Sequence, residues 1–196
     1  MKKGHIYTLA FMVALTGILV FALAFAYEGF KPSIAGNAQI RERRAVLDAL
    51  GLDKGLADDE VNSAFEKLIK PGEVKGHEAY VYEEDGMVKG YALPVSGPGL
   101  WGSISGYLGV NAEMNESLGL VFTSQNETPG LGGRIDEKQY KEQFRGLPLD
   151  PAAPIAYGDH GDYRVDAVTG ATQTSKAVLN LVNGAVKNVI HEGEAN

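Results

Sequence analysis

The segment from Asp166 to Ser175 carries the residues best suited to chemistry, in the order Asp-Ala-Val-Thr-Gly-Ala-Thr-Gln-Thr-Ser. It stands directly before a predicted C-terminal helix. The first turn of a helix offers unpaired N–H groups and the positive end of the helix dipole, which together favour a phosphate group. Gly170 and Ala171 lack bulk, so a phosphate can approach the backbone closely. The hydroxyl donors of this turn are Thr169, Thr172, Thr174 and Ser175.

These features predict a phosphate-binding turn. An ordinary capped helix start with several small polar residues is the alternative that composition alone leaves open. Two glycine-rich segments earlier in the chain add to the case. They are Ser-Gly-Pro-Gly-Leu-Trp-Gly at 96–102 and Gln-Asn-Glu-Thr-Pro-Gly-Leu-Gly-Gly at 125–133.

The order Asp-Ala-Val-Thr-Gly-Ala-Thr at 166–172 resembles the flavinylation motif of the FMN-binding domain family. That family includes the NqrC protein of the sodium-translocating NADH:quinone oxidoreductase (Nqr) and the RnfG protein of the Rnf electron-transport complex. Segments 96–102 and 125–133 resemble its glycine-rich turn and its Glu-Thr-Pro-Gly-Leu-Gly signature, and the three segments keep the family's order. Gln125 is a departure, because many relatives have His there, and this puts any role of a histidine at that position in doubt.

The resemblance implies that a flavin transferase joins the phosphate of FMN to the hydroxyl of Thr172 as a phosphoester. Thr172 is then a tether and takes no part as a nucleophile in turnover. Asp166 matches the acidic residue of the motif, and we assign it to recognition by the transferase. The other residues expected to contact the cofactor are Thr169, Gly170, Ala171, Thr174, Ser175, Glu127, Thr128, Leu131, Gly132, Leu100 and Trp101.

Three of these assignments have a plainer alternative. Trp101 is either a stacking partner of the flavin ring or simply a core or membrane-facing aromatic residue. Glu127 hydrogen-bonds either to the flavin or within its own loop. Pro129 and the neighbouring glycines either bring backbone close to the ring or only shape a turn.

The implied function is electron transfer by a protein that carries covalent FMN within an Nqr-type or Rnf-type ion-translocating membrane complex. One-electron transfers through a ring edge facing neighbouring subunits are expected, and the domain is not catalytic alone. The implied partners are the other subunits of the complex, the lipid bilayer and, during maturation, the transferase. The rival functions are a membrane-anchored FMN-binding regulatory or sensor domain and a non-redox anchored binding module. The lack of a signalling domain after Glu192 counts against the sensor.

Residues 6–27 contain no charged side chain, so they predict a membrane-spanning helix. At about 1.5 Å per residue they reach roughly 33 Å, enough for a hydrocarbon core of about 30 Å. A signal peptide cleaved after Ala24-Phe25-Ala26 is the alternative, although this apolar run exceeds the usual length of such a peptide. The basic flank at Lys2 and Lys3 favours a cytoplasmic N-terminus. The FMN domain is then expected outside the cytoplasm, on the bacterial inner membrane.

Hydrophobic periodicity predicts an α+β fold, with one transmembrane helix before a single domain of antiparallel sheet and flanking helices. We expect an anchor at 1–27, a linker at 28–36 broken by Gly29, Pro32 and Gly36, and the FMN-binding domain at 37–196. The expected helices are 37–50 from an N-cap at Asn37, one from Asp58 or Asp59 to Pro71, 138–144 and 175–190. The expected strands are 79–83, 87–94, 103–110 and 118–124.

Composition narrows the function further. The formal net charge of −7 argues against nucleic acid, which binds clustered lysine and arginine. The chain has no cysteine, so disulfides, thiolate zinc sites and iron–sulfur clusters on this chain are excluded. The loop from Asp159 to Asp162 lacks the spacing of a calcium-binding EF-hand, so we expect no metal there.

Overall fold

The computed structural model describes residues 2–158 and 161–190. Asp159 and His160, half of the weakly calcium-like loop, therefore lie outside the described residues. The chain divides into two compact units, residues 1–39 and residues 40–196. Each unit is described by itself.

Residues Lys2–Ala49 form one helix, α1. It is long and apolar enough to cross a membrane, and its apolar side chains are exposed along residues 6–34. A signal sequence passes the same test of length and composition. The apolar N-terminal helix expected from the sequence is thus present.

The expected break in the helix at residues 28–36 was wrong, as was the helix start at Asn37. Gly29, Pro32 and Gly36 all lie within α1. Each disfavours a helix locally, but a helix already nucleated on both sides propagates through isolated weak positions. The boundary between the two units falls after Gln39, a few residues beyond the expected linker.

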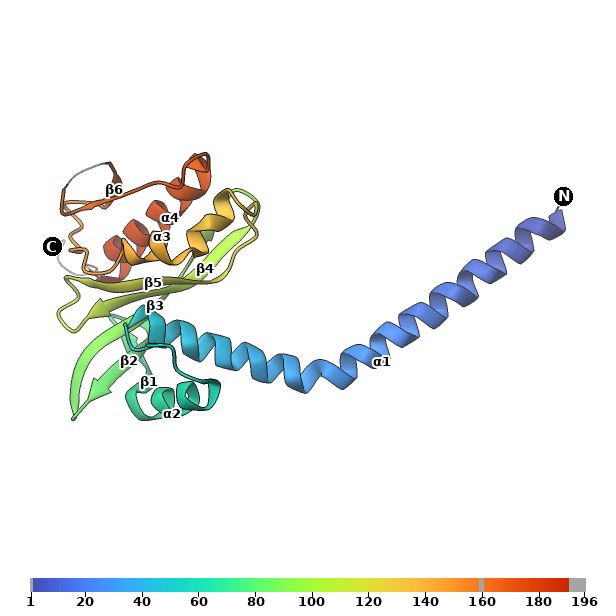
Figure 1. Ribbon diagram of the computed structural model, residues 1–196, viewed down its shortest axis with the longest axis horizontal. Coiled ribbons are helices and arrows are strands. Elements are labelled where there is room, and N and C mark those ends of the chain that lie inside the picture. The colour runs from blue at the N-terminus through green and yellow to red at the C-terminus, as the bar shows by residue number, and fades with distance from the viewer. Residues whose placement is uncertain (1, 159–160, 191–196) are drawn as a thin grey trace. The chain divides into compact units, whose positions relative to one another are not determined.

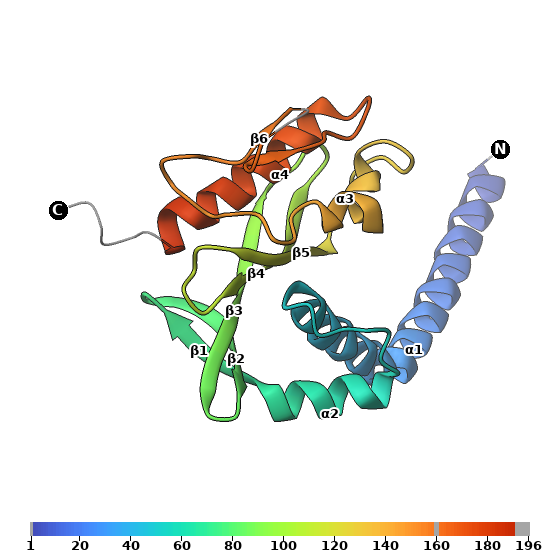
Figure 2. The same cartoon turned by 60° about the vertical axis from the view of Figure 1, so that its left-hand side comes forward.

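An antiparallel sheet of five strands in the order β1-β2-β3-β4-β5 forms the centre of the second unit, as Figures 1 and 2 show. Its strands are Ile69–Val74, His77–Glu84, Met87–Pro98, Ser103–Asn111 and Ser117–Ser124. The four expected strands are confirmed as β2 to β5. The first strand, β1, was missed because Pro71 indicated the end of a helix. Proline is tolerated there because β1 is an edge strand.

Tight turns join the first three strands. Asp85 and Gly86 have φ values of 53° and 75°, so the expected hairpin dipeptide does connect β2 to β3. Lys75 and Gly76 form a similar turn between β1 and β2, with φ values of 50° and 83°. Such turns hold the strands in a simple up-and-down order.

The remaining elements flank the sheet. Helix α2 covers Asp58–Leu68, the 3₁₀ helix η1 covers Gly132–Asp136 and α3 covers Lys138–Glu142. Helix α4 covers Thr172–Ala185 and continues into a π-helical turn, η2, at Val186–Ile190. Two short strands, β6 at Ala156–Tyr157 and β7 at Arg164–Val165, pair in parallel.

The two faces of the sheet bury different partners. Side chains alternate between faces along each strand, so Leu93 and Leu108 enter one cluster while Ala92 enters the other. The first cluster packs the sheet against α3 and α4, through residues such as Phe144 and Val178. The second packs it against α2 and residues 45–50, and Figure 2 shows these layers on opposite sides.

The C-terminal end of α1 lies directly on strand β4. A Cβ built on Gly109 would stand 2.0 Å from the carbonyl oxygen of Ala49, so backbone meets backbone there. Ala49 is fully buried. Only glycine at position 109 leaves room for this contact.

We therefore predict that Gly109→Ala lowers the free energy of unfolding by about 1–3 kcal/mol, because the added methyl group must displace the end of α1. Thermal unfolding of the detergent-solubilised chain, followed by circular dichroism, measures the effect. Gly184→Ala is the matched control, since no heavy atom lies within 4 Å of its added Cβ. Alanine suits a helix interior better than glycine, so the control holds or gains stability. Equal unfolding temperatures for both variants would contradict the packing argument.

Candidate functional site

Helix α4 begins at Thr172, three residues before the start expected from the sequence. Ala171 is its N-cap, and among the described residues no side chain caps the helix. The N–H groups of Thr172, Gln173 and Thr174 belong to the first turn, where an α-helix leaves them without an intrahelical partner. The phosphate-binding turn predicted from the sequence therefore sits on the helix terminus itself.

The turn that leads into α4 is closed by three hydrogen bonds. Ala171 N–H donates to the Val168 carbonyl at 3.0 Å, and Ser175 N–H donates to the Ala171 carbonyl at 2.9 Å. Val168 N–H donates to the Ser175 hydroxyl oxygen at 3.1 Å. Gly170 has a φ of 80°, which few other residues adopt. These contacts leave the side chains of Thr169 and Thr172 exposed at the surface.

Two of the predicted hydroxyl donors face inward. Thr174 is 1% exposed and Ser175 is fully buried. The Thr174 hydroxyl donates to Glu127 and the Ser175 hydroxyl accepts from Val168, so both already have partners in the protein. Their positions assign them to holding the turn, whereas Thr169 and Thr172 face solvent.

The carboxylate of Glu127 joins two segments that are far apart in the sequence. Its Oε1 accepts hydrogen bonds from the N–H groups of Leu100 at 2.8 Å and Trp101 at 3.1 Å. Its Oε2 accepts the hydroxyl of Thr174 at 2.5 Å. Glu127 itself is 5% exposed. One side chain thus links the three motifs noted in the sequence.

Two glycines make room for that carboxylate. A Cβ on Gly99 would lie 2.5 Å from Glu127 Oε1, and a Cβ on Gly132 would lie 2.5 Å from the Thr174 hydroxyl oxygen and 2.9 Å from Glu127 Oε2. Neither site accepts a side chain without displacing these contacts. The glycines of segments 96–102 and 125–133 therefore allow close approach to a buried carboxylate.

Gln125 orders the loop that carries Glu127. Its side-chain oxygen accepts the N–H of Glu127 at 2.6 Å, and its side-chain nitrogen donates to Asp136 at 2.8 Å. The carbonyl of Thr128 accepts from Leu131 and Gly133, which closes the following turn. At this position glutamine acts through hydrogen bonds within the loop.

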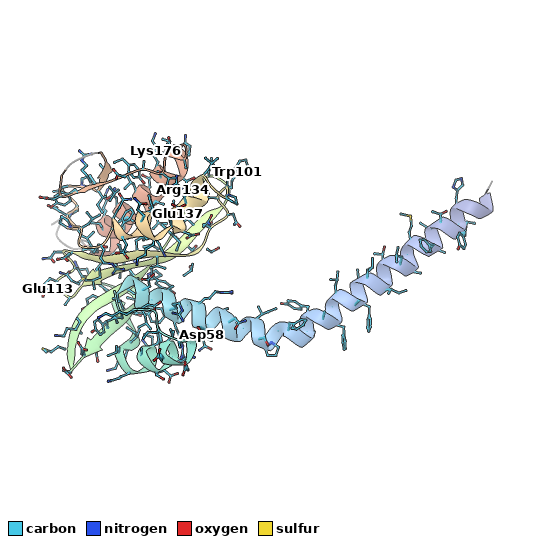
Figure 3. All side chains as sticks on the ribbon, in the orientation of Figure 1. Asp58, Trp101, Glu113, Arg134, Glu137 and Lys176 are labelled. Atoms are coloured by element: carbon cyan, nitrogen blue, oxygen red, sulfur yellow. The ribbon has the colours of Figure 1, made fainter. Side chains whose placement is uncertain are left out.

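Large apolar side chains lie exposed on the same loops. Leu100 is 54% exposed, Trp101 is 68% exposed and Leu131 is 47% exposed. A Cβ on Gly170, two residues before Thr172, would stand 3.4 Å from Leu131, so that leucine borders the α4 turn. Figure 3 shows Trp101 projecting from the domain at the end opposite Glu113. The core alternative for Trp101 is excluded by its exposure.

Asp166, the residue assigned to transferase recognition, is exposed. Its N–H donates to the side-chain oxygen of Gln143 at 2.6 Å, which anchors the backbone at the start of the motif. Asp166 and Thr169 line a shallow cavity of about 200 Å³ together with Arg134 and Glu137. Arg134 and Glu137 form an ion pair at 3.0 Å.

A pair of tyrosines supports the first turn of α4 from below. The hydroxyls of Tyr140 and Tyr157 lie 3.0 Å apart, and the Tyr157 hydroxyl donates to the Ser175 carbonyl at 2.7 Å. Burial raises the pKa of both phenols above the ordinary value of 10.0. The sequence analysis missed this contact because no spacing between residues 140, 157 and 175 indicates that they meet.

Within the described ranges 2–158 and 161–190, no group of three or more His, Cys, Asp or Glu side chains is placed to hold a metal ion. The chemistry of the site therefore rests on the α4 turn and the apolar side chains around it.

Comparison with known proteins identifies the class of domain. Residues 99–187 match the model of the family described as FMN-binding domain. This segment contains the α4 turn, Glu127 and most of the exposed apolar side chains. The resemblance to the FMN-binding domain family stated from the three motifs is confirmed.

Curated relatives narrow the likeness to NqrC, the third subunit of the Na⁺-translocating NADH-quinone reductase. The NqrC protein of Pseudomonas aeruginosa is 33% identical over 153 residues, which cover 69% of this chain and 59% of the relative. The NqrC protein of Pasteurella multocida is 35% identical over 114 residues, covering 53% of this chain and 43% of the relative. The chain thus spans about half the length of the curated relatives it matches.

Two solved structures share the fold. The crystal structure of NqrC from Shewanella oneidensis superposes with a TM-score of 0.66 at 22% identity, covering 76% of this chain and 93% of that one. The crystal structure of the corresponding NADH-quinone reductase protein from Parabacteroides distasonis gives 0.68 at 24% identity, with coverages of 81% and 94%. The expected α+β fold is confirmed by these neighbours.

The close approach at Gly132 yields a stability prediction. Gly132→Ala forces apart Thr174 and Glu127, so we expect a loss of about 1–3 kcal/mol in the free energy of unfolding. Urea denaturation followed by circular dichroism measures it. Gly133→Ala is the matched control in the same turn and should lose less, because the nearest atom to its added Cβ lies at 3.3 Å. The two variants losing equal stability would rule out this steric explanation.

The tyrosine pair predicts a fall in stability at alkaline pH. In the unfolded chain both phenols ionise near pH 10, whereas the folded protein retains their protons because their folded-state pKa values are raised. The free energy of unfolding is therefore constant well below about pH 10 and falls as the pH rises above it. Tyr140→Phe loses one such group and makes the fall shallower, at a cost of about 0.5–1.5 kcal/mol at neutral pH. Urea denaturation across this pH range measures both effects. An unchanged alkaline slope in the variant would contradict the assignment.

Proposed function

We propose that this chain is the FMN-carrying electron-transfer subunit of an Nqr-type membrane complex, with FMN attached to Thr172 through a phosphoester. The observation that carries the proposal is the placement of Thr172. Its exposed hydroxyl is the first residue of a 14-residue helix that no side chain caps among the described residues. Exposed Leu100, Trp101 and Leu131 lie on the loops that meet this helix.

The residues of the α4 turn fit a phosphate group. The first-turn N–H groups and the positive end of the helix dipole favour the negative charge of a phosphoester at Thr172. Lys176 stands four residues later, on the same side of the helix as Thr172, and adds an exposed positive charge. The neighbouring Thr169 hydroxyl is also exposed and provides a further donor.

The exposed apolar side chains fit a flat aromatic ring. A protein holds a flavin through packing on its faces and a few hydrogen bonds at its polar edge. Leu131 next to Gly170, and Leu100 with Trp101 on the facing loop, provide such packing beside Thr172. When attached, FMN supplies the ability to accept and release electrons. The chain's own residues keep it tethered, orient it and exclude water from its faces.

The relatives favour the quinone-reductase complex over Rnf. The curated relatives reported above are named as components of the Na⁺-translocating NADH-quinone reductase. We propose that α1 anchors the chain in the inner membrane with its N-terminus in the cytoplasm and the FMN domain outside. The other subunits of the complex would then supply and remove electrons at the exposed edge of the ring.

Asp166 is proposed as the recognition residue for the flavin transferase. Its side chain is exposed six residues before Thr172, while its N–H is held by Gln143. A carboxylate presented on an anchored backbone is suited to a transient contact with another protein. Arg134 and Glu137 beside it add a second charged pair to that surface.

The test is the intact mass of the full chain produced together with a flavin transferase. The wild-type chain is expected to gain the mass of one FMN minus one water, and Thr172→Ala is expected to gain nothing. Thr169→Ala is the matched control, because it removes the other exposed threonine of the same turn and keeps the tether. In-gel flavin fluorescence under denaturing conditions confirms that the attachment is covalent.

A bare wild-type mass in the presence of an active transferase would refute the covalent attachment. Modification that persists in Thr172→Ala but disappears in Thr169→Ala would show that our assignment chose the wrong threonine.

A further inference from the structure

The loop that carries Trp101 has little packing of its own. It is the connection of residues 99–102 between β3 and β4, closed by the N–H of Gly99 donating to the Gly102 carbonyl at 2.7 Å. The side chains of Leu100 and Trp101 are more than half exposed, so they bury little surface that would hold the loop in place. Backbone contacts must therefore determine where these side chains stand.

The hydrogen bonds to Glu127 supply those contacts. The N–H groups of Leu100 and Trp101 converge on one buried carboxylate oxygen, and the other oxygen accepts from Thr174. A carboxylate is an acceptor only, so all three bonds have the same polarity and can form together. Hydrogen bonds to a carboxylate are stronger than those between neutral groups.

Thr174 connects this carboxylate to the tether position. It is the third residue of α4, two residues after Thr172, and its side chain points into the protein while that of Thr172 points out. Because both belong to the first turn of one helix, fixing Thr174 also fixes the backbone that carries Thr172.

We propose that Glu127 is a positioning residue that holds the Leu100–Trp101 loop against the first turn of α4 before any flavin is attached. The apolar surface beside Thr172 is then preformed, and attachment of a ring costs little further ordering of this loop. That the ligand is a flavin rests on the proposed function. The hydrogen-bonded link itself is a property of the flavin-free chain and can be tested there.

The test is amide hydrogen exchange of the full-length, flavin-free chain in detergent, comparing wild type with Thr174→Val. Valine matches threonine in shape but cannot donate to Glu127, so one carboxylate oxygen loses its partner. We expect exchange at the amides of Leu100 and Trp101 to accelerate about tenfold, as loss of a hydrogen bond to a charged group implies. Peptides from the centres of β4 and β5 should exchange at the wild-type rate.

Thr174→Ser is the matched control, because serine retains the hydroxyl and should restore slow exchange at both amides. Glu127→Gln provides a second variant. It keeps an acceptor for the two N–H groups but lacks the charge, so exchange at both amides should rise above that of the wild type.

Wild-type exchange at Leu100 and Trp101 in both Thr174→Val and Glu127→Gln would overturn the proposal. Acceleration spread equally over β4 and β5 would also overturn it, because Glu127 would then support general stability and not this loop. In flavinylated protein, a changed flavin reduction potential in Thr174→Val but not in Thr174→Ser is expected, and equal potentials would count against positioning. If no FMN is attached at all, the proposed function fails while the exchange result still decides the role of Glu127.

Discussion

The buried carboxylate of Glu127 is the contact on which the arrangement around Thr172 depends. A carboxylate taken out of water is costly unless hydrogen-bond donors replace the lost hydration. Here the replacement comes from two backbone N–H groups of one loop and the hydroxyl of Thr174 on α4. Because the charge must be satisfied, the loop and the helix are held together around it.

Glycine makes this and the other close contacts of the domain sterically possible. Gly99 and Gly132 allow the Glu127 carboxylate and the Thr174 hydroxyl to approach the backbone, and Gly109 allows the end of α1 to lie on β4. The sheet supports both regions, with α4 packed on one face and α2 with residues 45–50 on the other. Glycines that read in the sequence as turn formers thus serve mainly as points of contact.

Local chemistry explains which predictions from the sequence were confirmed. Alternating apolar residues indicated β2 to β5, and the Asp85-Gly86 dipeptide indicated their first hairpin. Local rules failed where neighbouring structure outweighed them. Pro71 lies in an edge strand, and Pro32 lies inside a continuous helix. In both places the residue's local preference was correct in sign but too small to decide the outcome.

The sequence by itself determined the family of the domain, the apolar N-terminal helix and the candidate tether at Thr172, because each is written in contiguous residues. Only the tertiary structure decided what the neighbouring polar residues do. Thr169, Thr172, Thr174 and Ser175 look alike in the sequence, yet the first two face solvent and the last two face inward. The physical reason is that a helix start separates its residues by direction, and the partners of the inward residues come from distant segments.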